Sequence, residues 1–255
     1  MSEGAPMFCQ LRGNLEVNSK IGVILPTYCE AQNIERLIAE IEDLPLNTSI
    51  LVIDDSSPDG TAETVQKLQE KYPNLLLLVR PQKSGLGSAI TDGFRAYLSL
   101  KTVPEFVVTM DADYSHNPKD LPRLVSNMSS GCDLVIGSRY CKGGKTQGWS
   151  FTRKIISRGA NAIARGVLGL KLHDCTSGFR CYSTRFLQQT ISYLHSQTYD
   201  IQIETVKQAH SQGFRVEEVP ILFVNRKMGK SKLSLREIEN YVSYLFKTVA
   251  FRKNS

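Results

Sequence analysis

The stretch ILVIDDSSPDGTAETVQKL, residues 50–68, decides the fold class of this chain. Ile50 to Ile53 form an apolar run of strand length that ends at two acids. A helix is expected directly afterwards, from about Thr61 to Tyr72, with Val65 and Leu68 on its inner face. A fully apolar strand followed at once by a helix is typical of a parallel sheet that is covered on both faces. The stretch therefore predicts an α/β protein.

The same alternation extends on both sides of this stretch. Further strands are expected at residues 21–25, 75–79, 106–110 and 134–136, and helices at 34–41, 89–94 and 121–128. In such sheets ligands bind beyond the carboxyl ends of the strands. The polar residues that follow strands are therefore the candidate site, at positions 26–30, 54–60, 111–115 and 138–139.

The second half of the chain is less regular. Residues 153–167 predict a helix that is basic on one side, and 216–224 predict a strand that Pro220 interrupts. Residues 237–251 predict an amphipathic C-terminal helix. Since neither a repeat nor a linker is visible, we expect an N-terminal extension over 1–19 and one domain over 20–255.

Composition excludes several classes of protein. Hydrophobic residues make up 41% of the 255 residues, too many for a disordered or collagen-like chain. No apolar run approaches the roughly 18–20 residues of a membrane-spanning helix, and the N-terminus lacks the pattern of a signal peptide. The formal net charge of +6 permits anionic partners without selecting one.

The familiar phosphate-binding loops are absent. Gly144-Lys145-Thr146 resembles the end of a P-loop, but Arg139 stands where the first glycine is required. Gly85-Leu86-Gly87 lacks the third glycine of a dinucleotide-binding loop, because Ile90 stands there. P-loop and dinucleotide-binding folds are therefore not indicated.

Two acidic clusters follow two expected strands, Asp111-Ala112-Asp113 and the run DDSSPDGT at 54–61. Carboxylates at a ligand-binding edge suit a hard divalent cation, and Mg²⁺ usually shares its coordination shell with substrate phosphates. The alternative is structural. The first cluster would then lie in a turn that caps the next helix together with Asn117-Pro118, and the second would be a polar turn in which Asp59 or Thr61 caps a helix.

Four segments together resemble the inverting family 2 glycosyltransferases. They are ILPTYCEAQNI at 24–34, DDSSPDGT at 54–61, MDAD at 110–113 and IGSRY at 136–140. The resemblance implies a nucleotide-sugar (GT-A, Rossmann-like) fold, with a central mostly parallel sheet flanked by helices. Within the family, SPDGT at 57–61, DYSHNP at 113–118, RKIISRGAN at 153–161 and the pair Arg226 and Lys232 closely resemble the dolichol-phosphate mannose synthases. The likeness runs from about Lys20 to Phe251.

The resemblance implies a donor site and a metal site. The residues it places at the nucleotide sugar are Pro26, Tyr28, Glu30, Ile53, Asp55, Asp111, Ala112, Asp113, Arg139, Arg226 and Lys232. Asp111 and Asp113 would hold Mg²⁺ or Mn²⁺, whereas Ser115 would either contact the metal or leave that place to a water. Arg226 and Lys232 would clamp the leaving diphosphate.

The resemblance also implies an acceptor-phosphate site at Arg139, Arg153 and Ser157, with Asp113, Arg139 and Arg153 as the catalytic residues. A guanidinium fork suits a phosphate. The alternative is that the basic helix and the basic loop at 225–232 are solvated surfaces. Asp174 is a candidate partner for a sugar hydroxyl, and Trp149 and Phe151 would either contact lipid or pack.

The implied reaction moves mannose from GDP-mannose to dolichyl or another polyprenyl phosphate, with inversion. The implied partners are a membrane surface and small membrane-spanning subunits, at the cytoplasmic face of a membrane, which is the endoplasmic reticulum in a eukaryote. Nucleic acid is not expected as a partner. The alternatives are a polyprenyl-phosphate glucosyltransferase that uses UDP-glucose and a non-catalytic, nucleotide-binding subunit of a membrane complex. A sugar polymerase is disfavoured, since the chain has no QxxRW segment.

Overall fold

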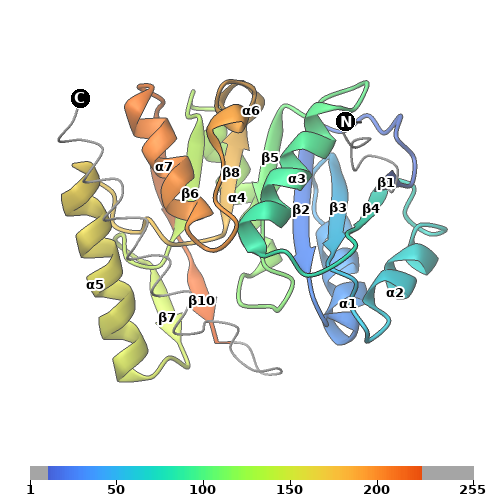
Figure 1. Cartoon of the computed structure of the whole chain (residues 1–255), viewed down its shortest axis with the longest axis horizontal. Coiled ribbons are helices and arrows are strands. Elements are labelled where there is room, and N and C mark those ends of the chain that lie inside the picture. The colour runs from blue at the N-terminus through green and yellow to red at the C-terminus, as the bar shows by residue number, and fades with distance from the viewer. Residues whose placement is uncertain (1–10, 226–255) are drawn as a thin grey trace, which may run out of the picture.

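An eight-stranded sheet runs through the protein, with helices on both of its faces (Figure 1). The computed structural model describes residues 11–225. The strands, in spatial order, are β1 (Leu11–Arg12), β4 (Leu75–Val79), β3 (Thr48–Asp54), β2 (Ile21–Thr27), β5 (Phe106–Thr109), β8 (Arg180–Ser183), β6 (Leu134–Ser138) and β9 (Val216–Pro220). Only β1 and β8 run antiparallel to their neighbours within this sheet of the described residues. The prediction of an α/β fold with a mostly parallel sheet is confirmed.

The helices cover the sheet in two groups. Their bounds are α1 (Ala31–Glu42), α2 (Thr61–Leu68), α3 (Leu86–Leu98), α4 (Leu121–Met128), α5 (Phe151–Leu168), α6 (Thr184–Thr190) and α7 (Ile201–Ser211), with 3₁₀ turns η2 (Pro118–Asp120) and η3 (Ile191–Tyr193). Buried residues of α1, α2 and α4 pack on one face of the sheet, and those of α3, α6 and α7 pack on the other. A small parallel sheet of β7 (Lys145–Gln147) and β10 (Leu222–Val224) lies beside α5 (Figure 1).

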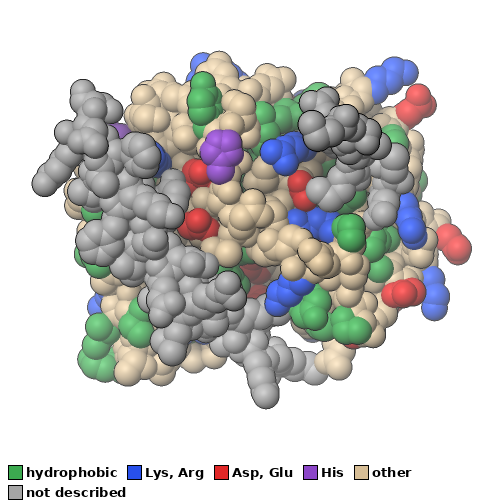
Figure 2. Space-filling model, in the orientation of Figure 1, with side chains coloured by type: hydrophobic (Ala, Val, Ile, Leu, Met, Phe, Trp, Pro, Cys, Tyr) green, Lys and Arg blue, Asp and Glu red, His purple; other side chains and the backbone are tan. Residues whose placement is uncertain are grey.

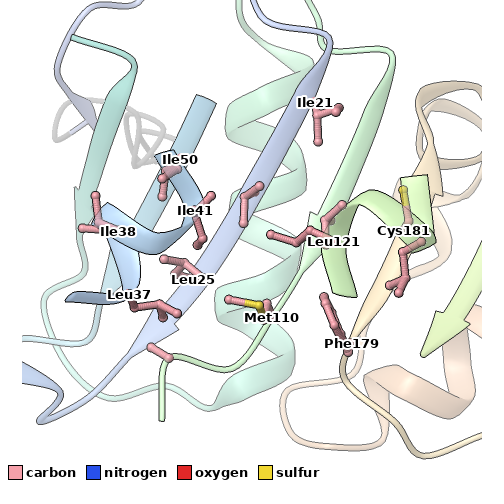
Figure 3. Packing of buried hydrophobic residues seen from close by; sticks show 14 of the residues in the cluster. Ile21, Leu25, Leu37, Ile38, Ile41, Ile50, Met110, Leu121, Phe179 and Cys181 are labelled. Carbon is pink, nitrogen blue, oxygen red and sulfur yellow. The ribbon is translucent and has the colours of Figure 1, made fainter. Parts of the chain in front are cut away.

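The alternation of side chains along the central strands produces two cores. Leu25 of β2 and Ile50 of β3 face α1, whose Leu37, Ile38 and Ile41 pack against them (Figure 3). Ile53, three residues after Ile50, faces the opposite core under α3. Because successive residues of a strand point to opposite faces, a run of buried apolar residues supplies both layers at once.

Three details differ from the sequence-based expectation. Helix α2 ends at Leu68 rather than at Tyr72. Leu11 and Arg12, within the expected N-terminal extension, pair with β4 and add a strand to the sheet. The short antiparallel β8, which was not predicted, lies between β5 and β6. Arg226, Lys232 and the expected helix at 237–251 lie outside the described residues. Within residues 11–225, no helix is both long and apolar enough to span a membrane.

Candidate active site

A hollow opens at the carboxyl ends of β2, β3 and β5, which lie at the lower edge of the sheet in Figure 1. It encloses about 770 Å³, including the solvent space at its mouth. Seven of the residues assigned to the donor site line it: Pro26, Tyr28, Glu30, Asp55, Asp111, Ala112 and Asp113. Residues from three separate segments of the chain therefore meet where the α/β topology predicts a ligand.

The first wall of the hollow is held by the acidic turn at 54–61. Backbone N–H groups of Cys29, Glu30 and Ala31 donate to side-chain oxygens of that turn at 2.9–3.0 Å. The acceptors include Asp59 Oδ2 and Thr61 Oγ1. Asp54 is fully buried and accepts from Thr27, as well as from the backbone and hydroxyl of Ser57. Most of the acidic turn thus serves the fold, as the structural alternative proposed, but the N-cap of α2 is Gly60 rather than Asp59 or Thr61.

Asp55 is the acid of this turn that lines the hollow. Behind it lies Arg80, only 2% exposed, which donates from Nε and Nη2 to the two oxygens of Asp55 at 2.6 and 2.8 Å. Arg80 also donates from Nη1 to Ser88 and Asp92 of α3. A fork-to-fork pair of this kind fixes the direction of the Asp55 carboxylate. Arg80 was not predicted from the sequence, although it directly follows β4 at the same edge of the sheet.

Asp111 and Asp113 form the floor of the hollow beyond β5. Asp113 Oδ1 accepts from the backbone N–H of Ser115 at 3.0 Å, and the N–H of Asp111 donates to His116 Nδ1 at 3.2 Å. His116 is completely buried and stacks on Phe179, so burial lowers the pKa of its imidazole. The cap of the following 3₁₀ turn is Asn117, not either aspartate. The two carboxylates are therefore held toward the hollow rather than used as helix caps.

These two carboxylates fit a divalent cation that is shared with substrate. Among residues 11–225, no group of three or more His, Cys, Asp and Glu side chains gathers as a metal site. Mg²⁺ is usually held by one or two carboxylates and completes its shell with waters and substrate phosphates, so a pair of aspartates suffices. The Ser115 hydroxyl is buried without a hydrogen-bond partner in the described part of the chain, and both interpretations of Ser115 stay open.

Arg139 follows β6 and is held by Asp174. Its Nε and Nη2 donate to the two Asp174 oxygens at 2.7 and 2.8 Å, and its backbone N–H donates to Asp174 Oδ2 at 3.0 Å. Burial alone would raise the pKa of Asp174, but the Arg139 charge and these hydrogen bonds lower it below its ordinary value. Asp174 is completely buried. Its carboxylate thus serves Arg139, which corrects the expectation that it binds a sugar hydroxyl.

Arg153 and Ser157 lie one turn apart on α5, close to Arg139. Arg153 stacks on Trp149, with 4.2 Å from its Cζ to the ring centroid, and its Nη1 donates to Asn225 Oδ1 at 2.9 Å. The Arg139 guanidinium lies 5.4 Å from the same Trp149 ring. Ser157 is tied to the loop after β6, where its hydroxyl accepts from Tyr140 at 2.7 Å. Trp149 is 8% exposed and packs between the two arginines.

Two described donor-site candidates, Ile53 and Arg139, are not among the residues that line the hollow, and the side chain of Ile53 is wholly in the core. Conversely, Lys83, Thr198 and Tyr199 line the hollow and were not predicted. Lys83 Nζ lies 4.4 Å from the Tyr28 ring centroid, and its place in the loop after β4 was a usable signal. Thr198 and Tyr199 carry no such signal, since tertiary packing against α3 brings them there.

Comparisons with known proteins agree with this geometry. The family model described as glycosyl transferase family 2 matches residues 22–191. A polyprenol monophosphomannose synthase of Mycolicibacterium smegmatis is 39% identical over 214 residues, which are 83% of this chain and 80% of the relative. An undecaprenyl-phosphate mannosyltransferase of Micrococcus luteus is 38% identical over 216 residues, 84% of this chain and 88% of the relative.

Solved structures show the same fold at low sequence identity. Glucosyl-3-phosphoglycerate synthase of Mycobacterium tuberculosis, in complex with Mn²⁺, UDP and glucosyl-3-phosphoglycerate, has a TM-score of 0.63 at 20% identity, over 99% of this chain and 85% of that one. A mannosyltransferase of Pyrobaculum calidifontis with GDP-Man and Mn²⁺ has a TM-score of 0.61 at 16% identity, over 92% and 66%. From the family match and the two relatives of nearly 40% identity, it follows that this chain belongs to glycosyl transferase family 2.

Proposed function

We propose that the protein transfers mannose from GDP-mannose to the phosphate of dolichyl or another polyprenyl phosphate, with inversion at the anomeric carbon. The observation that carries the proposal is the meeting of acids and an arginine at one edge of the sheet, with Asp111 and Asp113 in the hollow after β5 and Arg139 after β6, beyond the intervening β8. The names of the two relatives support mannose as the sugar and a polyprenyl phosphate as the acceptor. In a eukaryote the reaction would take place at the cytoplasmic face of the endoplasmic reticulum.

The donor would lie in the hollow. Tyr28 and Pro26 supply apolar contact for the nucleotide base, and the carboxylate of Glu30 can accept hydrogen bonds from a guanine edge. Asp55, held by Arg80, is directed at the same space. Only the backbone of Ile53 could contact the nucleotide, because its side chain is buried. Arg226 and Lys232 are proposed to contact the diphosphate.

Asp111 and Asp113 would hold Mg²⁺ or Mn²⁺, with Ala112 between them at the floor of the hollow. When bound, the ion supplies positive charge that stabilises the leaving diphosphate. The contribution of the chain is to fix this turn, through the N–H of Ser115 on the Asp113 carboxylate and through the backbone N–H of Asp111 on His116 Nδ1.

The acceptor would be held by Arg139, Arg153 and Ser157. Two nitrogens of the Arg139 side chain hold Asp174, and no hydrogen bond within residues 11–225 uses its Nη1. An acceptor phosphate carries negative charge at neutral pH, so one of its oxygens can attack without first giving a proton to a protein base. The new bond joins that oxygen to the anomeric carbon, and the bond from this carbon to the diphosphate oxygen breaks, releasing GDP. An in-line displacement of this kind converts an α-linked donor into a β-linked product.

A donor competition separates this assignment from its alternatives. Labelled GDP-mannose and labelled UDP-glucose are offered separately and together, with a short polyprenyl phosphate and Mg²⁺ or Mn²⁺, and lipid-extractable label is measured. The proposal predicts label from GDP-mannose that excess UDP-glucose does not displace. Preferred transfer from UDP-glucose would instead show a glucosyltransferase, and no transfer from either donor would favour a non-catalytic subunit.

A further inference from the structure

An unpaired amide lies in the interior beside the candidate active site. Gln202, in the first turn of α7, is 2% exposed, and neither its Oε1 nor its Nε2 has a hydrogen-bond partner within residues 11–225. Thr198 and Tyr199, just before it, line the hollow. On the face shown in Figure 2, by contrast, the acidic and basic side chains of the described residues are interspersed. A buried polar group without a partner costs free energy, so the Gln202 amide is a candidate for binding a group that the chain does not supply.

A small open space adjoins this amide, in front of the half-buried Gly178. A Cβ placed on Gly178 would lie 3.5 Å from Gln202 Nε2, 3.6 Å from Asp111 Oδ1 and 3.9 Å from His116 Cε1. These are ordinary van der Waals distances, and the φ angle of Gly178 is not in the left-handed region. Neither crowding nor backbone conformation thus requires a glycine here. Its missing side chain leaves room beside Asp111, which lines the hollow.

Both walls of this space are held by Arg180, which is completely buried. Its Nη1 donates to the backbone carbonyl of Gln202 at 2.6 Å, and its Nε donates to the carbonyl of Ser177 at 2.7 Å. One guanidinium therefore joins the segment before Gly178 to the first turn of α7. The hydroxyl of Ser177 is a further buried polar group without a partner within residues 11–225. The unpaired amide thus belongs to a firmly held part of the fold.

His116 adds a hydrogen-bond donor next to this space. Its Nδ1 accepts from the backbone N–H of Asp111 at 3.2 Å, so in the neutral imidazole the proton lies on Nε2. Nε2 is bonded to Cε1, and it is buried without a partner in the described part of the chain. The space is therefore bordered by donors, from Gln202 and His116, and by acceptors, from Gln202 and Asp111.

A hydroxyl group matches this set better than an ion does. A hydroxyl both donates and accepts, whereas a phosphate oxygen would meet the carboxylate of Asp111 and a metal ion would meet N–H groups. We propose that the space in front of Gly178 receives a hydroxyl of the donor hexose, with the Gln202 amide as its hydrogen-bond partner. This inference rests on the proposed function, which puts the diphosphate at Asp111 and Asp113. In a nucleotide sugar the hexose is joined to the diphosphate and would therefore lie beside it.

Replacing the amide in the full-length protein should have two effects of opposite sign. Gln202→Met keeps the length of the side chain and removes both polar atoms. We expect the urea midpoint of the unliganded protein to rise by roughly 0.3–0.5 M, because an unpaired buried amide is removed. We expect kcat/KM for GDP-mannose to fall roughly tenfold, because the hydroxyl loses its partner. An amide that only supports the fold would give a lower midpoint, and this result would overturn the proposal.

Gly178→Ala tests the space itself, since it adds one methyl group and leaves the amide in place. The variant should keep the wild-type fold, because a Cβ fits there, and should lower kcat/KM for GDP-mannose roughly tenfold. The affinity for GDP, measured by calorimetry, should stay at the wild-type value in both variants, because GDP has no hexose. Gln208→Met on α7, and Gly166→Ala on α5, where a Cβ meets nothing within 4 Å, are the matched controls and should behave like wild type. Wild-type kcat/KM in Gly178→Ala would contradict the proposed use of this space.

Deoxy analogues of GDP-mannose identify the hydroxyl concerned. Wild type and Gln202→Met are assayed with the 2-, 3-, 4- and 6-deoxy donors and a short polyprenyl phosphate. We expect one deoxy donor for which the two proteins differ by less than about twofold, since neither can form the bond, and a difference of roughly tenfold for the others.

The same assays separate this inference from the proposed function. A roughly tenfold difference with every deoxy donor would overturn the hydroxyl site and leave the proposed function in place. If wild type transfers no mannose, the proposed function is wrong, and calorimetry still decides the hydroxyl site. Equal affinities of wild type and Gln202→Met for GDP-mannose would then overturn it.

Discussion

Two buried arginine–aspartate pairs lie in the two halves of the proposed site, which we call the donor edge around Asp55 and the acceptor edge around Arg139, and they face it in opposite ways. At the donor edge, the carboxylate of Asp55 lines the hollow and Arg80 backs it. At the acceptor edge, Arg139 is the outer member and Asp174 is completely buried behind it. Each buried charge requires a counter-charge, so the sign of the deeper partner fixes the sign of the outer one. A deep arginine leaves an aspartate facing the site, and a deep aspartate leaves an arginine facing it.

Removing the backing arginine gives the largest expected effect. Arg80→Gln leaves Asp55 and Asp92 without their shared cation in a buried environment. We expect the free energy of unfolding to fall by about 3–5 kcal/mol, measured by urea denaturation. The matched control Arg36→Gln breaks an exposed pair with Glu40 and should change the free energy of unfolding far less, because solvent screens that pair. Similar losses in both variants would show that burial does not distinguish the pairs.

Removing the backing acid should damage the acceptor edge selectively. Asp174→Asn leaves Arg139 buried without a counter-charge, and we expect about 3 kcal/mol of lost stability. In kinetic assays the KM for lipid phosphate should rise while the KM for the donor stays near wild type. A rise in the KM for the donor, with no change in the KM for lipid phosphate, would contradict the assignment of Arg139 to the acceptor edge.

The same pair predicts a pH dependence of stability. The folded pKa of Asp174 lies below its ordinary value of 3.8, so its contribution is fully present above that pH and is lost as the pH falls through the lower folded pKa. The difference in urea midpoint between wild type and Asp174→Asn should therefore shrink in strong acid. A difference that stays constant from neutral pH into strong acid would contradict this assignment.

Asp113→Asn tests the floor of the donor edge, where the carboxylate accepts from the backbone N–H of Ser115. We expect turnover to fall by roughly 10²–10³-fold, because the ion that neutralises the leaving group loses a ligand. Stability should stay close to wild type, since Asp113 lies at the floor of the hollow rather than in the core. Unchanged turnover across a Mg²⁺ or Mn²⁺ titration would remove Asp113 from its assigned role.

Arg153→Ala gives the smallest of these effects. Its stacking on Trp149 and its bond to Asn225 leave the guanidinium at the acceptor edge, and losing a charged hydrogen bond should raise the KM for lipid phosphate by roughly tenfold. Arg165→Ala, on the same helix, is the control. An equal rise in both variants would show a general loss of positive charge rather than a contact.

The donor edge was largely predictable from the sequence because its residues directly follow strands. Tyr28 and Asp55 each come one residue after a strand end, and Asp113 comes four residues after one, where parallel strands bring them together. The fate of Ile53 was also accessible, since the alternation of β3 turns it toward the core under α3. The resemblance placed Ile53 at the nucleotide, but the alternation of side chains along β3 turns the Ile53 side chain into the core, so it does not face the hollow.

The acceptor edge was less predictable because its partners are distant in sequence. Asp174 reaches Arg139 across 35 residues, and Asn225 reaches Arg153 across 72. The insertion of the antiparallel β8 brings residues 174–178 beside β6, and nothing in a four-residue strand foretells that pairing. The exposure of Phe151 was likewise one of two open alternatives until packing placed Trp149 inside and Phe151 outside.

The most direct test of the account is the reaction itself. Full-length protein is incubated with radiolabelled GDP-mannose, a short polyprenyl phosphate and Mg²⁺ or Mn²⁺, and the anomeric configuration of the extracted lipid product is determined. The account predicts a β-linked mannosyl phosphate lipid whose formation needs Asp113. An α-linked product, or no labelled lipid, would contradict it.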